Sequence, residues 1–413
     1  MLNLLLLTAT LGAGLREAPA ELAGFNAARL ARVDSTIEAA IRDGASPGVA
    51  LAIGRRGEMV RLRGYGRLTY AANAPAVTDS TLFDLASLTK VIGTTTAVMK
   101  LVDEARIHLD IPIHQYLAVW PSTGEASGIT LRHLLNHTSG LPAGMNLWSV
   151  RGREAKISRI AQLRLVAPPG MQTVYSDVGM VVVGAIIESV TGERLDDYLE
   201  REVFAPMGMK ETMFNPAERM VENEPILVPT YDASIFFAPF NLIALWNAGT
   251  EKKFIEEAQV APTENGLRGR VHDPIANELD GVAGNAGLFS SARDLAVFAE
   301  AMIEAAAADR DAPFARAATV DEFVNRGQNK RGLGWESPSG RSSAGDYFSA
   351  SSFGHTGYTG TSIWIDPVHD LYVILLTNRI YPTAVNQKHI ALRRAVHDEV
   401  ELAISDQDVA LRD

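Results

Sequence analysis

The chain of 413 residues contains no cysteine. It therefore has no disulfide, no thiol nucleophile and no thiolate metal site, and cysteine usage indicates no redox compartment. Basic residues are also too few to balance the acidic ones, 38 against 49, which gives a formal net charge of −11. Because the basic residues are scattered without forming a stripe, we expect capture of neither nucleic acid nor an anionic membrane surface.

Repeats and low-complexity tracts are absent as well, and 47% hydrophobic with 21% charged residues is typical of a globular protein. Two apolar segments raise the question of a membrane. Residues 1–22 have an apolar run followed by small residues, but no Lys or Arg precedes the run. We expect either a signal peptide, which would make the protein periplasmic or secreted, or an N-terminal helix of a cytoplasmic protein.

The second apolar segment, residues 233–250, carries no charge and reaches the length of a membrane-spanning candidate. Pro239 and Gly249 are among the residues that interrupt it. We therefore predict a buried hairpin or a flap over a pocket, with membrane contact as the alternative, and we expect no stable transmembrane anchor.

The chain begins and ends with patterns typical of strands. Residues 26–44 have helical spacing of apolar residues and end at a glycine, and residues 47–66 read as two strands joined at a Gly-containing turn. Near the other end, a strand pattern at residues 363–365 is followed by a turn at residues 366–370 and a β-rich run at residues 371–377. Residues 386–405 predict a closing helix. Between these ends, helical patterns cover residues 131–137, 175–192 and 193–208.

Strands at both ends with helices between them predict an α/β (α+β) fold. One antiparallel sheet would be built from the two termini, flanked by helices and interrupted by a mainly helical lobe. We assign residues 23–85 and 285–413 to the sheet lobe and residues 86–284 to the helical lobe, with the active site between them.

The stretch FDLASLTKVIG, residues 83–93, contains a candidate nucleophile. Ser87 is followed three residues later by Lys90, and no other serine in the chain has a lysine at that spacing. On a helix these two side chains share a face, and a serine needs a neighbour that takes its proton. A desolvated lysine with a lowered pKa can be that base or assist it. The spacing alone is a weak signal and fits a solvated helix face better.

Ser46 is the rival nucleophile, because GASPG at residues 44–48 matches the Gly-x-Ser-x-Gly elbow of α/β-hydrolases. That elbow needs a strand before the serine and a helix after it. Here a helix precedes and a strand follows, so we predict a turn that ends a helix.

Two further motifs support Ser87. Tyr175 lies in a predicted turn just ahead of an apolar helix, and a tyrosine next to a lysine can move a proton between nucleophile and leaving group. His355, Thr356 and Gly357 stand at the predicted entry to a strand, which would supply a donor to the oxyanion.

The motifs together resemble those of the serine penicillin-recognising family, which contains class C β-lactamases, D-alanyl-D-alanine carboxypeptidases, D-aminopeptidases and related esterases. The resemblance runs from about Gly44 to Asn378. Its five motifs are Ser87 to Lys90, LLNHTSGLP at residues 134–142, Tyr175 to Asp177, AGNAGLFSSARDLAVF at residues 283–298, and His355 to Gly357. The resemblance implies a β-lactamase/transpeptidase-like fold without a metal or an organic cofactor.

The resemblance also implies roles for residues at the matching positions. Ser87 would attack the substrate carbonyl to form an acyl-enzyme, while Lys90 and Tyr175 share the proton transfer. Backbone N–H groups of Ser87 and Tyr358 would hold the oxyanion. The residues that would contact the substrate are Asp177, His355, Thr356 and Gly357.

Two positions depart from the family pattern. Asp177 stands where Asn is common, which replaces an amide by a group that is usually anionic, and His355 stands where most β-lactamases have lysine. Both changes argue against an efficient β-lactamase. We therefore expect a small ester or a D-amino-acid amide or peptide as substrate. The alternatives are a true β-lactamase and a non-catalytic protein that binds cell-wall peptides or penicillin; the complete Ser-Lys-Tyr set argues against the latter. The motifs do not indicate an oligomeric state.

The remaining polar candidates have structural explanations. His133 and His137 stand four residues apart, but the Glu of a His-Glu-x-x-His zinc motif is missing. His272 either shapes the substrate site or caps a helix. We expect Asn378 and Arg379 to end a strand rather than take part in chemistry.

Overall fold

The computed structural model describes residues 17–221, 255–256, 259–308, 310–325 and 331–412. The apolar segment 233–250 and most of the N-terminal segment 1–22 lie outside these residues. Within them, no helix combines the length and the apolar character that a membrane crossing requires.

The N-terminal elements follow the sequence pattern. Helix α2 spans Ala27–Arg42; the side chain of Asn26 accepts a hydrogen bond from a backbone N–H of its first turn. Strands β1 (Gly48–Arg55) and β2 (Glu58–Gly66) pair as a hairpin. Arg56 and Gly57 both have positive φ, the backbone of a tight turn whose twist matches that of the strands. The predicted helix and hairpin are confirmed.

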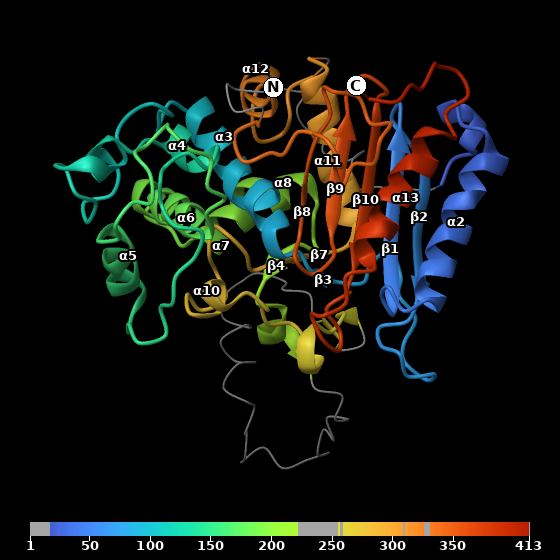
Figure 1. The fold of residues 1–413 in the computed structure, drawn as a ribbon, viewed down its shortest axis with the longest axis horizontal. Helices are drawn as coiled ribbons and strands as arrows, with labels where there is room; N and C mark the ends of the chain where they lie inside the picture. Colours follow the sequence, from blue (N-terminus) through green and yellow to red (C-terminus); the bar gives the residue numbers. More distant parts are fainter. Residues whose placement is uncertain (1–16, 222–254, 257–258, 309, 326–330, 413) are drawn as a thin grey trace, which may run out of the picture.

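A five-stranded antiparallel sheet forms the centre of the molecule, in the order β2-β1-β10-β9-β8. Its C-terminal strands are β8 (Phe353–Thr356), β9 (Ser362–Asp366) and β10 (Leu371–Thr377). Figure 1 shows the blue strands β1 and β2 beside the orange and red strands β8 to β10. The predicted α/β fold with one antiparallel sheet from both termini is therefore confirmed.

Both faces of this sheet are covered by helices. Alternate residues of β1 enter different cores: Ala50 and Ala52 join the large core that contains helix α11 (Ala292–Ala306), while Leu51 and Ile53 join a second core with α2 and α13 (His389–Glu401). Since both faces are buried, β1 is apolar at almost every position instead of alternating with polar residues.

Most helices between β2 and β8 gather on the side of the molecule away from α2 and α13 (Figure 1). One of them, α6 (Asp177–Thr191), has ten consecutive buried residues, from Val178 to Ile187. The others are α3 (Thr96–Asp103), α4 (Leu131–Leu135), α5 (Arg153–Ala161), α7 (Leu195–Leu199), α8 (Ala205–Met207) and α10 (Pro274–Asn277). Helix α12 (Ala317–Val324) packs against α11 instead.

Two small sheets complete the described fold. Their strands are β3 (Phe83–Asp84), β4 (Met213–Phe214) and β7 (Leu288–Ser290) in one, and β5 (Met220–Val221) and β6 (Ile255–Glu256) in the other. The strand β3 leads directly into the Ser87 turn. The assignment of residues 23–85 and 285–413 to one lobe and 86–284 to another stays a prediction.

Candidate active site

Ser87 lies in a short 3₁₀ turn, Ala86–Leu88, that follows β3. A π-helical segment, Lys90–Thr95, then leads into α3. The regular helix face expected from the sequence is therefore wrong in detail. The expected proximity holds nonetheless, because residues three apart lie above one another in a 3₁₀ turn, and Lys90 Nζ is 3.0 Å from Ser87 Oγ.

The residues just before Ser87 hold the turn in an uncommon backbone conformation. Ala86 has a φ of 46°, in the left-handed region that residues with a Cβ seldom adopt. The buried carboxylate of Asp84 accepts the Ala86 N–H at 2.9 Å and the His272 N–H at 2.8 Å. Local strain of this kind persists where surrounding contacts determine the backbone, and here they fix the position of Ser87.

Lys90 is fully buried and donates in three directions. Its Nζ lies 3.0 Å from Ser87 Oγ, 2.9 Å from the carbonyl oxygen of Asn285 and 2.6 Å from Asp177 Oδ1. An ammonium has three N–H groups, so each finds an acceptor. Burial acts to lower the pKa of Lys90, but Tyr175 and Asp177 outweigh it and the pKa is raised. The condition for a lowered pKa is therefore not met, and Lys90 is a cation at neutral pH.

Tyr175 lies in the segment before α6, as the sequence predicts, and is 37% exposed. Lys90 Nζ is 5.1 Å from the centroid of its ring. Asp177 is the first residue of α6, and the side chain of Ser176 caps that helix by accepting the Gly179 N–H. One helix start therefore places both Tyr175 and Asp177 against Lys90.

His137 holds the segment that carries Tyr175. Its carbonyl oxygen accepts the Val174 N–H at 2.8 Å, and its Nδ1 accepts the Ser176 N–H at 3.2 Å. Its ring lies 4.5 Å from the ring of Tyr175, centroid to centroid. Burial keeps the pKa of His137 well below its usual value, which agrees with a neutral ring that accepts at Nδ1. His137 thus contacts the backbone on both sides of Tyr175.

His133, by contrast, belongs to the start of α4. Its Nδ1 accepts the Thr130 N–H at 3.2 Å, while the Thr130 side chain accepts the His133 N–H, a reciprocal cap. In the described part of the chain, His133 and His137 belong to no group of side chains that could share a metal ion.

The segment His355 to Gly357 ends the strand β8 instead of entering a strand, which corrects the prediction. His355 is fully buried, with Nδ1 2.8 Å from the carbonyl oxygen of Thr356 and Nε2 3.9 Å from Glu336 Oε1. Burial lowers the pKa of His355 to about 4. The imidazole is therefore neutral at pH 7 and provides no positive charge to the site.

The turn after β8 packs against the Ser87 turn. Gly357 donates its N–H to the carbonyl oxygen of Thr361 at 2.8 Å, and the Thr361 hydroxyl donates to the carbonyl oxygen of Leu85 at 3.1 Å. A Cβ on Gly357 would lie 2.1 Å from Thr361 Oγ1 and 2.5 Å from the Leu85 oxygen. Only glycine allows this approach, which brings the backbone of Tyr358 toward that of Ser87.

Two side chains hold Tyr358, whose surface is 55% exposed. The guanidinium of Arg379 lies 4.5 Å from its ring centroid, and Arg379 Nε donates to its carbonyl oxygen at 2.8 Å. The second side chain is that of His272, whose ring stacks on the ring of Tyr358 with centroids 5.9 Å apart. The cap of α10 is Asp273, so of the two alternatives for His272, contact with the candidate site is the one observed.

The comparison with known families agrees with this geometry. A family model described as Beta-lactamase matches residues 33–398. The chain belongs to the β-lactamase family. A protein of Escherichia coli strain K12, named as a D-alanyl-D-alanine carboxypeptidase, is 31% identical over 407 residues, which covers 91% of this chain and 88% of the relative.

Solved structures of the family share the fold. EstCE1, described as a hydrolase with promiscuous acyltransferase activity, superposes with a TM-score of 0.65 at 23% identity and covers 90% of this chain and 99% of its own. A beta-lactamase/D-alanine carboxypeptidase from Pseudomonas syringae gives 0.64 at 20% identity, with coverage of 90% and 99%. The protein is thus a hydrolase of the β-lactamase and penicillin-binding type.

Ser46 lies apart from this family site. It is fully buried in the turn between α2 and β1, and its hydroxyl donates to the carbonyl oxygen of Gly48 at 2.8 Å and to Asn378 Oδ1 at 3.2 Å. Asn378 in turn donates to the carbonyl oxygen of Leu68 at 2.9 Å. Both predictions, a turn at Ser46 and a structural Asn378, are confirmed.

Sequence reasoning missed several neighbours of the family motifs. Asn285 accepts from Lys90 through its backbone carbonyl oxygen, a contact that the polar side chain in AGNAG did not signal. Asp84 precedes the motif by three residues. Glu336, which faces His355, and Arg331, whose Nη2 lies 3.6 Å from Glu336, had no local signal because they reach the site through tertiary packing.

Proposed function

We propose that the protein is a serine acyl-transfer hydrolase in which Ser87 forms an acyl-enzyme with a small ester or a D-amino-acid amide or peptide. The observation that carries this proposal is the position of Lys90 Nζ, 3.0 Å from Ser87 Oγ and 2.6 Å from Asp177, in a fully buried setting. A buried cation held by a carboxylate next to a partly accessible hydroxyl is an arrangement suited to nucleophilic catalysis.

Proton transfer in this proposal passes through Tyr175. All three N–H groups of the Lys90 ammonium have acceptors, so Lys90 acts as a cation beside Tyr175, with Nζ 5.1 Å from the ring centroid, and not as the base. Tyr175 takes the proton of Ser87 as Oγ bonds to the acyl carbon, and gives it to the leaving oxygen or nitrogen as that bond breaks. Water then repeats the sequence in reverse: it attacks the acyl carbon, and its proton returns through Tyr175 to Ser87 Oγ.

The oxyanion of both steps would lie between backbone N–H groups of Ser87 and Tyr358. The contacts of Gly357 and Thr361 with Leu85 support this, since they join the two turns that carry these groups. Arg379 and His272 hold the Tyr358 side of the pair.

The choice of substrate rests on charge. His355 is neutral and Asp177 is a carboxylate, so neither attracts the carboxylate that a β-lactam carries. The neutral ring of His355 donates from Nδ1 to the carbonyl oxygen of Thr356, which leaves Nε2 as an acceptor and supplies no charge for a substrate carboxylate. The name of the Escherichia coli relative, a D-alanyl-D-alanine carboxypeptidase, supports the D-peptide part of this choice.

The test follows three substrates with the wild type and two variants. A p-nitrophenyl ester, a D-Ala-D-Ala peptide and benzylpenicillin are incubated with wild type, Ser87→Ala and Ser46→Ala, while the intact protein mass and substrate loss are recorded. We expect Ser87→Ala to lose at least about a thousandfold in turnover and to form no adduct, while Ser46→Ala stays close to wild type. The opposite pattern would remove Ser87 as the nucleophile.

The same experiment separates the alternative activities. Turnover of the ester or peptide with little penicillin loss supports the proposal. Fast clearing of a penicilloyl adduct would show a true β-lactamase instead, and a stable adduct with no turnover of any substrate would show a penicillin-binding protein without hydrolytic function.

A further inference from the structure

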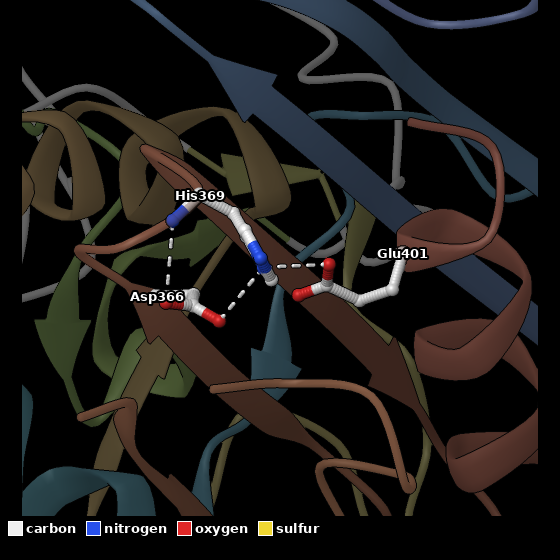
Figure 2. Close-up of side chains that lie close together, drawn as sticks. All are labelled: Asp366, His369 and Glu401. Carbon is white, nitrogen blue, oxygen red and sulfur yellow. Dashed lines mark hydrogen bonds and ion pairs between the residues drawn. The ribbon is translucent and has the colours of Figure 1, made fainter. Parts of the chain in front are cut away.

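Three titratable side chains meet where the turn between β9 and β10 lies next to the end of α13. Asp366 is the last residue of β9, His369 lies in the turn between β9 and β10, and Glu401 is the last residue of α13. Asp366 and Glu401 are fully buried, and His369 is 7% exposed. Figure 2 shows the imidazole of His369 between the two carboxylates.

The spacing of their polar atoms suits a small cation. His369 Nδ1 lies 3.2 Å from Asp366 Oδ2 and 2.9 Å from Glu401 Oε2, and one ligand atom from each residue falls within 4.8 Å of the others. Nitrogen and oxygen ligands at about 2.0–2.2 Å from a tetrahedral ion are about 3.3 Å apart. The three atoms therefore need only small adjustments to surround one metal ion.

Hydrogen bonding leaves Glu401 incomplete. Glu401 Oε2 has His369 Nδ1 as its ion-pair partner at 2.9 Å, but among the residues that the structure describes neither carboxylate oxygen of Glu401 has a well-aligned hydrogen-bond donor. A buried carboxylate with so few donors is costly. Asp366, in contrast, is held in place, because Ser349 donates from its backbone at 2.6 Å and from its hydroxyl at 2.7 Å. Hydrogen bonds of this kind orient carboxylates that ligate metals.

Charge balance points the same way. Two carboxylates with one protonated imidazole leave a net negative charge in a buried place, whereas a divalent ion with a neutral imidazole gives neutrality. Arg55 is a nearby cation that donates from Nε to the carbonyl oxygen of His369 at 2.9 Å. It also donates to the carbonyl oxygen of Ala23, lies over the ring of Phe25 and pairs with Asp406, whose Oδ1 is 3.0 Å from Nη2, so Arg55 has an acid of its own.

We propose that Asp366, His369 and Glu401 bind one divalent transition-metal ion, with Zn²⁺ as the representative ion, in a site that fastens α13 to the sheet. One nitrogen and two oxygen ligands suit Zn²⁺ better than Ca²⁺ or Mg²⁺, which prefer oxygen alone. Water would fill the fourth position.

The site is separate from the Ser87 site. Asp366 stands four residues along β9 from Ser362, which pairs with Thr356, and four residues of strand span about 13 Å. The ligands also face the core of α2 and α13, the opposite sheet face from α11, since Trp364 two residues earlier belongs to that core. The ion would therefore stabilise the fold and take no part in acyl transfer.

The test uses the untagged full-length chain, treated with a chelator and then titrated with ZnCl₂. We expect one Zn²⁺ per chain after desalting, measured by mass spectrometry of the metal, and a thermal midpoint that rises by several degrees. Glu401→Gln should weaken Zn²⁺ binding by at least about tenfold. Glu300→Gln, at a largely buried carboxylate on α11, is the matched control and should bind as wild type does.

Two further measurements keep the proposal open to refutation if Glu401→Gln fails to fold. Co²⁺ added to the wild type should produce visible absorption bands of a nitrogen- and oxygen-ligated ion, and His369→Gln should abolish them. Chelation should leave ester hydrolysis unchanged at a temperature where the protein stays folded. A wild type that binds no stoichiometric Zn²⁺, equal binding by Glu401→Gln, or ester hydrolysis that disappears with the metal would each overturn the proposal.

Discussion

Asp177 Oδ1 lies 2.6 Å from the ammonium nitrogen of Lys90, and the side chain of Lys90 is completely buried. The carboxylate and the cation thus form one unit next to Ser87. A carboxylate at this distance favours the charged form of the lysine, whereas an asparagine would offer only a neutral amide. Together with Tyr175, the carboxylate of Asp177 therefore raises the pKa of Lys90 against the effect of burial.

Asp177→Asn should make the enzyme more sensitive to alkaline pH. Asp177 is one of the causes that raise the pKa of Lys90, so its removal lowers that pKa. If the ammonium form is the active one, activity is lost as pH rises through the Lys90 pKa. We therefore expect the falling limb of the kcat profile for ester hydrolysis to move to lower pH. A limb in the same place as in wild type would show that the carboxylate does not control the lysine.

The same substitution should change the preference between substrates. An amide at position 177 no longer repels an acidic group, so reaction with benzylpenicillin or an acidic peptide should increase relative to the ester. The measurement is the ratio of kcat/KM values for the two substrates in wild type and Asp177→Asn. An unchanged ratio would remove the argument that Asp177 selects against carboxylates.

Tyr175→Phe should cost about a hundredfold or more in kcat, the effect expected for a positioned acid or base. The phenylalanine keeps the ring between His137 and Lys90 but removes the group that moves the proton. KM for the ester should change much less, because the ring still packs in place. A loss of only a few fold would mean that the proton takes another route.

His137→Asn tests whether His137 positions Tyr175. Asparagine tolerates the φ of 60° at this residue and offers an acceptor to Ser176, but it removes the ring that packs on Tyr175. We expect kcat to fall by about tenfold or more, with little change in KM. In a Tyr175→Phe background the same substitution should have almost no further effect on kcat. Additive losses in the double variant would contradict a role through Tyr175.

The sequence predicted what depends on local patterns. The hairpin of residues 47–66 has alternating and apolar residues on both sides of a glycine turn, and it forms as expected. The proximity of Ser87 and Lys90 was also predictable, because three residues of any helical turn bring the two side chains together. The type of helical turn at Ser87 was not predictable, because Asp84 and tertiary contacts hold the backbone at Ala86.

Features formed by distant segments escaped prediction. Strand β8 is short and contains only one large apolar residue, so no strand pattern in the sequence predicts it. Its pairing with β9 and the bridge between Gly354 and Glu336 form it. The cluster of Asp366, His369 and Glu401 needs α13 to pack on the sheet, because Glu401 lies far along the chain from the other two. Sequence spacing carries no information about such contacts.

Buried neutral histidines should make the protein sensitive to acid. Burial lowers the pKa of His397 to about 3, against 6.5 for a free histidine. Between pH 3 and pH 6.5 the unfolded chain binds a proton at this histidine that the folded chain does not, so the free energy of unfolding decreases as pH falls from 6.5. One such residue lowers the free energy of unfolding by about 1.4 kcal/mol per pH unit, which is about 3 kcal/mol at pH 4.5.

His397→Gln removes this titration while leaving a side chain that can still donate to the carbonyl oxygen of Arg393. Urea unfolding at pH 7.5 and at pH 4.5 gives the loss of unfolding free energy for each protein. We expect the loss to be about 3 kcal/mol smaller in His397→Gln than in wild type, whatever its stability at pH 7.5. His108→Gln, at an exposed histidine, is the matched control and should keep the wild-type loss. Equal losses in all three proteins would show that His397 is not buried in its neutral form.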